Sequence, residues 1–248
     1  MNHRIPSGYQ AQADELRGRV IAITGAGEGI GQALALAAAA HGAEVILIGR
    51  TVRKLEAVHA QIAQLKQREA SIAPLDLEKA LARDYDQLAD ALMRRYGRLD
   101  GLVHNAAILG SLAPIEQYDV PTWCRVLHVN LTAAFALTQV LLPALQAAAD
   151  ASVIFTASDE GREPSAYWGA YAVSKSGIDA LAQVLADEMQ SGGTVRVNAF
   201  NPGRVRTRLR RQAFPAEDLN TLPTPPQIVQ PYLWLLGPAS RGMSGRRL

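Results

Sequence analysis

This sequence contains very little cysteine and has a net charge close to zero. Cys124 is the single cysteine in 248 residues, so the chain can form neither an internal disulfide nor a multi-cysteine metal site. The net charge is +2, from 25 basic and 23 acidic residues, which by itself indicates no nucleic-acid partner. The five histidines are not spaced from acidic residues as metal ligands are, so we expect no bound metal.

Long uninterrupted hydrophobic runs are missing as well. The most apolar stretch, residues 131–149, is broken by Thr132, Pro143 and other residues unfavourable for membrane insertion. Residues 1–10 contain no apolar core of the kind a secretion signal needs. We therefore expect a cytoplasmic protein with no membrane partner, in which residues 131–149 form a helix buried on two sides within a larger assembly.

Short apolar runs alternate with long helical stretches along the chain. Strands are predicted at residues 19–24, 44–48, 71–75, 99–104, 152–156 and 195–200, and helices at 32–41, 52–67, 80–96, 122–149 and 169–190. Several strands are almost continuously apolar, as strands covered on both faces are. The alternation predicts one α/β domain, with a mostly parallel sheet and helices on both faces. We assign residues 18–248 to this domain and residues 1–17 to an amino-terminal arm.

A glycine-rich turn follows the first predicted strand and precedes a helix. It reads Thr-Gly-Ala-Gly-Glu-Gly-Ile-Gly over residues 24–31. Glycines permit positive φ and let the backbone approach a pyrophosphate, while the amino terminus of the helix offers unpaired N–H groups. In this strand–turn–helix context the turn predicts a dinucleotide site, although a tight turn without a ligand has the same composition.

The Thr-Gly-x-x-x-Gly-x-Gly spacing resembles the short-chain dehydrogenase/reductase family, and the resemblance covers about residues 18–248. It implies a single Rossmann-like, doubly wound domain with a seven-stranded sheet, a nicotinamide cofactor, and hydride transfer between that cofactor and a carbonyl or alcohol. The matching cofactor positions are Thr24, Gly25, Gly27, Gly29, Ile30, Gly31, Asp76, Leu77, Asn105, Ala106, Pro202, Gly203, Val205 and Thr207. The family's Asn-Asn-Ala-Gly motif is degraded here, since His104 and Ala107 replace its ends. Asp76 is equally suited to capping a helix.

The end of the second strand bears on the choice of cofactor. NAD-binding members place an acidic residue there, whereas this sequence has Gly49 and Arg50. Arg50 can bind a 2′-phosphate through charged hydrogen bonds, and Arg53 is a second candidate. Glu28 stands where many NADP-dependent members carry a basic residue. The sequence favours NADP(H) and leaves NAD(H) possible, and a purely solvated Arg50 would leave the preference unresolved.

Tyr171 and Lys175 lie four residues apart near the start of a predicted helix. This spacing places the phenol and the ammonium on one helical face, where the positive charge favours the phenolate. By resemblance, Tyr171 transfers the proton, Lys175 lowers the tyrosine pKa and holds the nicotinamide ribose, and both contact the cofactor. The resemblance also makes Ser158, thirteen residues before Tyr171, the group that polarises the substrate oxygen. Asn130 would position a water that relays protons from Lys175.

The substrate side of the sequence is less informative. Five arginines gather in eight residues: Arg204, Arg206, Arg208, Arg210 and Arg211. They predict either a solvated face of a mobile lid or a site for a phosphorylated carrier of an acyl thioester. Tyr167, Trp168 and Phe214 could line an apolar pocket. Members of the family usually form homodimers or homotetramers through the equivalents of residues 122–149 and 169–190, and the resemblance implies the same here. Two hypotheses for the function remain. One is a reductase of small carbonyl compounds, 3-oxoacyl thioesters among them, and the other is a non-catalytic NADP(H)-binding sensor or scaffold.

Overall fold

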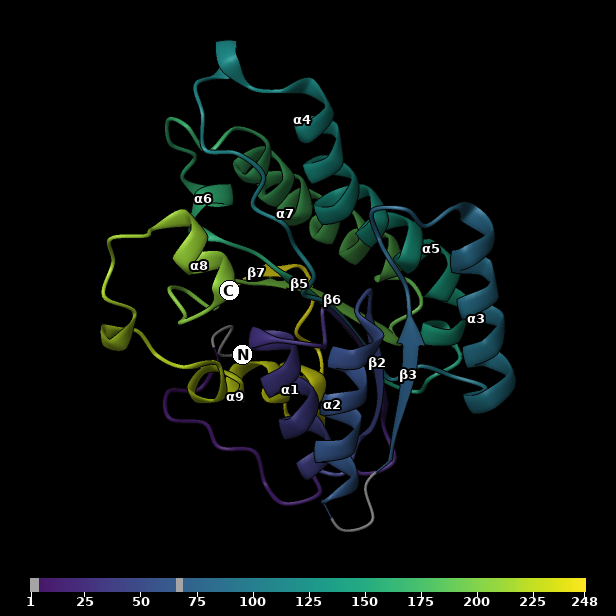
Figure 1. Cartoon of the computed structure of the whole chain (residues 1–248). Helices are drawn as coiled ribbons and strands as arrows, with labels where there is room; N and C mark the ends of the chain where they lie inside the picture. The colour runs from purple at the N-terminus through teal and green to yellow at the C-terminus, as the bar shows by residue number, and fades with distance from the viewer. Residues whose placement is uncertain (1–4, 66–68) are drawn as a thin grey trace.

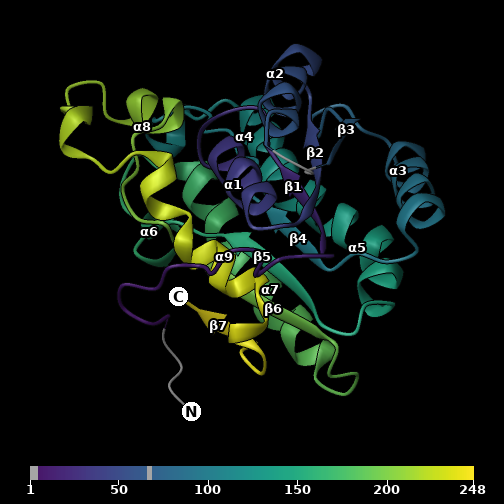
Figure 2. The same ribbon diagram turned by 90° about the horizontal axis from the view of Figure 1, so that it is seen from below.

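Seven parallel strands form one sheet (Figure 1). Their order is β3-β2-β1-β4-β5-β6-β7, which can be followed in Figure 2. The computed structural model describes residues 5–65 and 69–248. The strands are β1 (Val20–Thr24), β2 (Glu44–Gly49), β3 (Ala70–Pro74), β4 (Gly101–His104), β5 (Ala151–Thr156), β6 (Val195–Phe200) and β7 (Arg246–Arg247). The chain order reverses between β1 and β4, which confirms the doubly wound architecture and places the expected binding crevice above these two strands.

Helices cover both faces of the sheet, as predicted. They are α1 (Gly29–Ala40), α2 (Val52–Ala63), α3 (Ala82–Tyr96), α4 (Val120–Leu127), α5 (Ala133–Gln146), α6 (Asp159–Arg162), α7 (Gly169–Met189), α8 (Arg208–Ala213) and α9 (Gln230–Leu236). Figure 2 shows α1, α2 and α9 on one face and α3, α5 and α7 on the other. Each face buries its own apolar cluster against the sheet, which explains why the inner strands are apolar on both sides.

The predicted strands and helices lie close to the observed ones. Every residue of β1, β4, β5 and β6 is buried, which is why these runs were readable from hydrophobicity. The strand predicted to begin at residue 99 begins at Gly101, although Leu99 before it is fully buried. The helix predicted at residues 52–67 ends at Ala63, and Gln67 lies outside the described residues.

The helix predicted at residues 122–149 consists of three consecutive segments. A π-helical turn, η2 (His128–Thr132), joins α4 to α5. Such turns occur frequently at functional sites, and this one contains Asn130. By length and composition the combined run Val120–Gln146 could cross a membrane, but it packs against α3 and α7 as a core helix does.

The amino-terminal segment from residue 5 packs against α9. The Leu16 side chain is fully buried in the cluster beneath α1 and α9. The Ala11 N–H donates to Oε1 of Gln230 over 2.8 Å, and the Tyr9 ring meets the Trp234 ring edge-on at 6.5 Å. The segment therefore completes one of the two apolar clusters.

Candidate active site

A cleft of about 460 Å³ opens at the carboxyl ends of the strands, above the point where strand order reverses. The structure brings most of the predicted site residues to its walls. They are Thr24, Gly25, Gly27, Gly29, Ile30, Arg50, Asp76, Leu77, Asn105, Ala106, Ser158, Tyr171, Lys175, Pro202, Gly203, Val205 and Thr207. Gly31 and Asn130 lie outside this lining.

The glycine turn gives Gly31 a role beneath the cleft surface. Gly25 and Gly29 have φ of +67° and +59°, in the left-handed region that favours glycine. A Cβ on Gly31 would lie 2.3 Å from the Gly25 carbonyl oxygen. Gly31 therefore lets α1 pack against the turn, while the other glycines expose their backbone to the cleft.

Thr24 and Asn105 hold the ends of β1 and β4 together. The backbone N–H groups of Asn105 and Ala106 donate to Thr24 Oγ1 at 3.0 and 3.1 Å, and Asn105 Nδ2 donates to the Thr24 carbonyl at 3.1 Å. His104, at the degraded motif position, stacks on Phe155 with ring centroids 4.7 Å apart. Burial lowers the pKa of His104 to about 3, so this ring is a neutral structural group.

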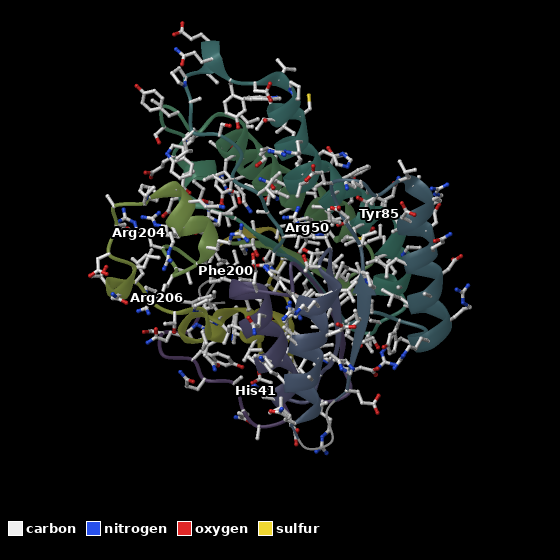
Figure 3. All side chains as sticks on the ribbon, viewed as in Figure 1. His41, Arg50, Tyr85, Phe200, Arg204 and Arg206 are labelled. Carbon is white, nitrogen blue, oxygen red and sulfur yellow. The ribbon has the colours of Figure 1, made fainter. Side chains whose placement is uncertain are left out.

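Charged side chains line the end of the cleft beside β2. Arg50 lies 3.9 Å from Oε2 of Glu78 and remains mostly exposed (Figure 3). Lys54 lines the cleft and forms an ion pair with Glu28. Arg53, the second candidate from sequence, is exposed and outside the lining, whereas Lys54 was missed. Lys54 lies in the first turn of α2, on the side that packs against Gly27 of the glycine turn, and no motif in the sequence indicates this.

Tyr171 and Lys175 lie on the buried face of α7. Their exposed fractions are 6% and 4%, and the Lys175 ammonium donates to the Thr156 carbonyl over 2.7 Å. Nζ of Lys175 is 5.8 Å from the centre of the Tyr171 ring. A Cβ on Gly161 would lie 2.6 Å from Cβ of Lys175, so this glycine lets α6 pack closely against α7.

Burial dominates the protonation of both groups. It raises the pKa of Tyr171 to about 12, and the charge of Glu160 raises it further. The hydrogen bond with Ser158 lowers this pKa but does not compensate for burial. Burial also lowers the pKa of Lys175 to about 8, against the charges of Asp179 and Glu160. The sequence predicts a lowered tyrosine pKa beside Lys175, but desolvation raises the pKa of Tyr171 instead, and the Lys175 ammonium donates to the Thr156 carbonyl.

The side chain of Asn130 is fully engaged with its neighbours. Its Oδ1 accepts from the Ile108 N–H at 2.8 Å, and its Nδ2 donates to the Ile108 carbonyl at 2.9 Å and to Ser174 Oγ at 3.0 Å. A small cavity nevertheless lies between Asn130 and Lys175. Asn130 thus fixes the segment after β4 against α7 and lies beside that cavity.

Ser158 follows β5 and precedes the first turn of α6. Its hydroxyl donates to the carboxylate of Glu160, and both side chains line the cleft. Glu160 was not predicted from the sequence. It lies two residues after Ser158, but only the turn at the start of α6 brings its carboxylate back to the serine hydroxyl, and a sequence motif does not show that turn.

An aromatic wall closes the substrate side. The Trp168 ring lies 5.7 Å from Tyr171 and 5.6 Å from Phe214, centre to centre. Tyr167 is exposed with a φ of +73° and lies outside the cleft lining. The expectation that it lines the pocket is therefore wrong.

Two of the five clustered arginines stabilise their own segment. Arg206 donates to the carbonyls of Leu219 and Asn220. Arg210 forms a two-bonded ion pair with Glu217 at 2.6 and 2.7 Å and covers the Phe214 ring. Figure 3 places Arg204 at the outer edge of this region, well separated from Arg50.

Comparisons with known proteins agree with this geometry. A family model for short chain dehydrogenases matches residues 19–218. An uncharacterized oxidoreductase of Escherichia coli K12, YciK, is 44% identical over 237 residues, covering 96% of this chain and 93% of the relative. A short-chain dehydrogenase structure from E. coli CFT073 complexed with NADPH is 43% identical, with a TM-score of 0.93 and coverage of 96% and 98%. One from Shigella flexneri complexed with NADP is 42% identical, with a TM-score of 0.92 and coverage of 95% and 98%. The chain belongs to the short-chain dehydrogenase family of oxidoreductases.

Proposed function

We propose that the protein is an NADP(H)-dependent oxidoreductase that interconverts a small carbonyl compound and its alcohol. The observation that carries this proposal is the convergence of Ser158, Tyr171 and Lys175 on the cleft that begins at the glycine turn. A protein that only binds the nucleotide has no use for a buried proton donor beside a hydroxyl in the same cleft.

The cleft residues fit a nicotinamide dinucleotide phosphate. Gly25 and Gly29 open the backbone for a pyrophosphate, and Arg50 and Lys54 put positive charge near the end of β2. The NADP and NADPH complexes of the two similar structures support the same preference. NAD(H) remains possible because Glu28 partly offsets the charge of Lys54. When bound, the nicotinamide would give or accept the hydride.

The protein's own groups then manage the substrate oxygen and its proton. Ser158 donates a hydrogen bond to that oxygen and stabilises the charge that develops on it. Tyr171 gives its proton in reduction and accepts one in oxidation. Lys175 supplies positive charge and holds the nicotinamide ribose, and the Asn130 turn positions a relay water beside it.

The substrate and the assembly are parts of the same proposal. A 3-oxoacyl thioester is one candidate, since Arg208 lines the cleft and the clustered arginines of residues 204–211 could contact a carrier phosphate. The apolar side chains of Phe135 on α5 and Val173 on α7 are exposed. They support a homodimer or homotetramer in which these helices pair. We place the protein in the cytoplasm, with no nucleic-acid or membrane partner.

The test begins with fluorescence titrations of NADPH and NADH. A panel of ketones, aldehydes and 3-oxoacyl thioesters is then offered with the preferred cofactor. Reduction of panel members, lost in Tyr171→Phe with NADPH binding retained, supports the proposal. NADPH binding with no turnover of any member, or equal turnover in Tyr171→Phe, would favour the non-catalytic sensor or scaffold.

A further inference from the structure

A carboxylate lies beside the serine that should polarise the substrate. Glu160 accepts a hydrogen bond from the Ser158 hydroxyl and lines the same cleft as Tyr171 and Trp168. Its charge also contributes to the raised pKa of Tyr171. Its position, held by the close packing of Gly161 against α7, puts a negative group next to the reacting oxygen.

The hydrogen bonds of Ser158 cannot all be made at once. A serine hydroxyl has one proton to donate. If Ser158 donates to the substrate oxygen, Glu160 loses its partner and is left with an unpaired charge in a half-buried site. A substrate that replaces the lost hydrogen bond would therefore bind better than one that does not.

The charge of Glu160 acts on Lys175 and raises its pKa, but the two side chains form no direct ion pair. Lys175 donates to the Thr156 carbonyl, and the neighbouring Arg162 is directed at Asp179, with Nε 3.3 Å from Oδ2. Within residues 5–65 and 69–248, Glu160 forms no ion pair. The carboxylate is within two hydrogen-bond lengths of the substrate oxygen, about 6 Å, which is within reach of a group on the carbon beside the carbonyl.

We propose that Glu160 is a specificity-determining residue that selects substrates with a hydrogen-bond donor, an ammonium or a hydroxyl, on the carbon next to the carbonyl or carbinol. A carboxylate on that carbon is disfavoured by like charge. The inference rests on the proposed function, and it narrows the substrate class: 3-oxoacyl thioesters lack such a donor and would be poor substrates.

The experiment compares four alcohols that differ only in the group beside the carbinol. They are 2-amino-1-phenylethanol, 1-phenyl-1,2-ethanediol, 1-phenyl-1-propanol and 3-hydroxy-3-phenylpropanoate, which carry an ammonium, a hydroxyl, a methyl and a carboxylate on the carbon next to the carbinol. Their dissociation constants are measured by calorimetry on the enzyme–NADPH complex, where an alcohol cannot react. The variants are Glu160→Gln, which keeps the shape and removes the charge, and Glu163→Gln, which removes an exposed charge three residues away.

We expect the wild type to bind the amino alcohol at least about tenfold more tightly than the methyl compound, as a charge-assisted hydrogen bond implies. The diol should rank second and 3-hydroxy-3-phenylpropanoate last. Glu160→Gln should lose most of the ammonium preference and bind 3-hydroxy-3-phenylpropanoate more tightly than wild type, while Glu163→Gln should keep the wild-type ranking. Thermal unfolding and NADPH affinity verify that both variants are folded.

Three results overturn the inference: the methyl compound binding as tightly as the donor-bearing alcohols, a ranking that survives Glu160→Gln, or no binding by any of the four. The corresponding ketones are tested for turnover separately. If the binding ranking holds and depends on Glu160 while no ketone is reduced, the proposed function fails and the ligand preference stands.

Discussion

The polar side chains at one end of the cleft are buried, and those at the other end are exposed to water. At the catalytic end, Tyr171 and Lys175 are almost fully buried and Asn130 makes three hydrogen bonds within the protein. At the end beside β2, the side chains of Arg50 and Lys54 are 61% and 43% exposed and pair with nearby carboxylates. Water screens the second group and not the first. The same kind of substitution should therefore cost much more at the catalytic end.

Tyr171→Phe should have the largest effect. It removes the proposed proton donor and keeps the ring against Trp168, so we expect turnover to fall by about 10²- to 10⁴-fold with NADPH affinity within about threefold of wild type. Steady-state kinetics and a fluorescence titration measure the two quantities. The matched control, Tyr167→Phe, removes a hydroxyl from an exposed tyrosine outside the cleft and should be neutral. Retained turnover in Tyr171→Phe would contradict the assignment.

Asn130→Ala should rank second, through stability. It leaves the N–H and carbonyl of Ile108 without their partner and removes the hydrogen bond that the Ser174 hydroxyl accepts. We expect the free energy of unfolding to fall by about 2–4 kcal/mol, measured by urea denaturation. Asn220→Ala, at an exposed position of the segment after α8, is the control and should cost much less. Equal losses in the two variants would show that the burial of Asn130 does not increase the cost of removing its hydrogen bonds.

Lys175 should make stability depend on pH. Burial lowers its pKa in the folded protein from 10.5 to about 8, so between these values the unfolded chain binds more protons than the folded one. The contribution of this group to the free energy of unfolding should therefore rise with pH from about 8 to 10 and be lowest below pH 8. Urea denaturation across this range should show a steeper rise in wild type than in Lys175→Met. Identical slopes would place the Lys175 pKa near its ordinary value.

Arg50→Ala should produce a moderate change at the exposed end. We expect NADPH binding to weaken by about tenfold, because a charged hydrogen bond to the 2′-phosphate is lost, while NADH binding stays the same. The loss should shrink at high salt, which screens an exposed pair. Arg53→Ala, on the same segment and outside the cleft, is the control. Equal weakening of NADH would assign Arg50 to another part of the cofactor.

Glu28→Gln should have the smallest effect and the opposite sign. It frees Lys54 from its ion pair, so NADPH should bind about two- to fivefold more tightly. An NADPH titration of the double variant Glu28→Gln with Lys54→Met tests whether Lys54 is responsible, because the gain in NADPH affinity should disappear without the lysine. A gain that persists would mean that Glu28 acts on the cofactor directly.

The contrast between the two ends also explains what could be predicted from the sequence. Fold and catalytic positions depend on backbone spacing and buried apolar runs, so the strands and the positions of Ser158, Tyr171 and Lys175 in one cleft followed from pattern. The choice of Lys54 over Arg53 depends on which face of α2 meets the turn. The pairing of Ser158 with Glu160, and of Arg210 with Glu217, depends on side-chain directions. Desolvation of Tyr171 is a property of the assembled site, so its raised pKa could not be read from a nearby lysine.

The packing of the amino-terminal segment on α9 has a consequence for how the chain folds. The hydrogen bond from Ala11 to Gln230 joins residues 219 positions apart. Contacts of such long sequence separation form slowly because a large loop must close first. During synthesis, the layer that contains Leu16 and α9 therefore cannot be completed until almost all of the chain has left the ribosome, whereas the helices on the opposite face can assemble earlier.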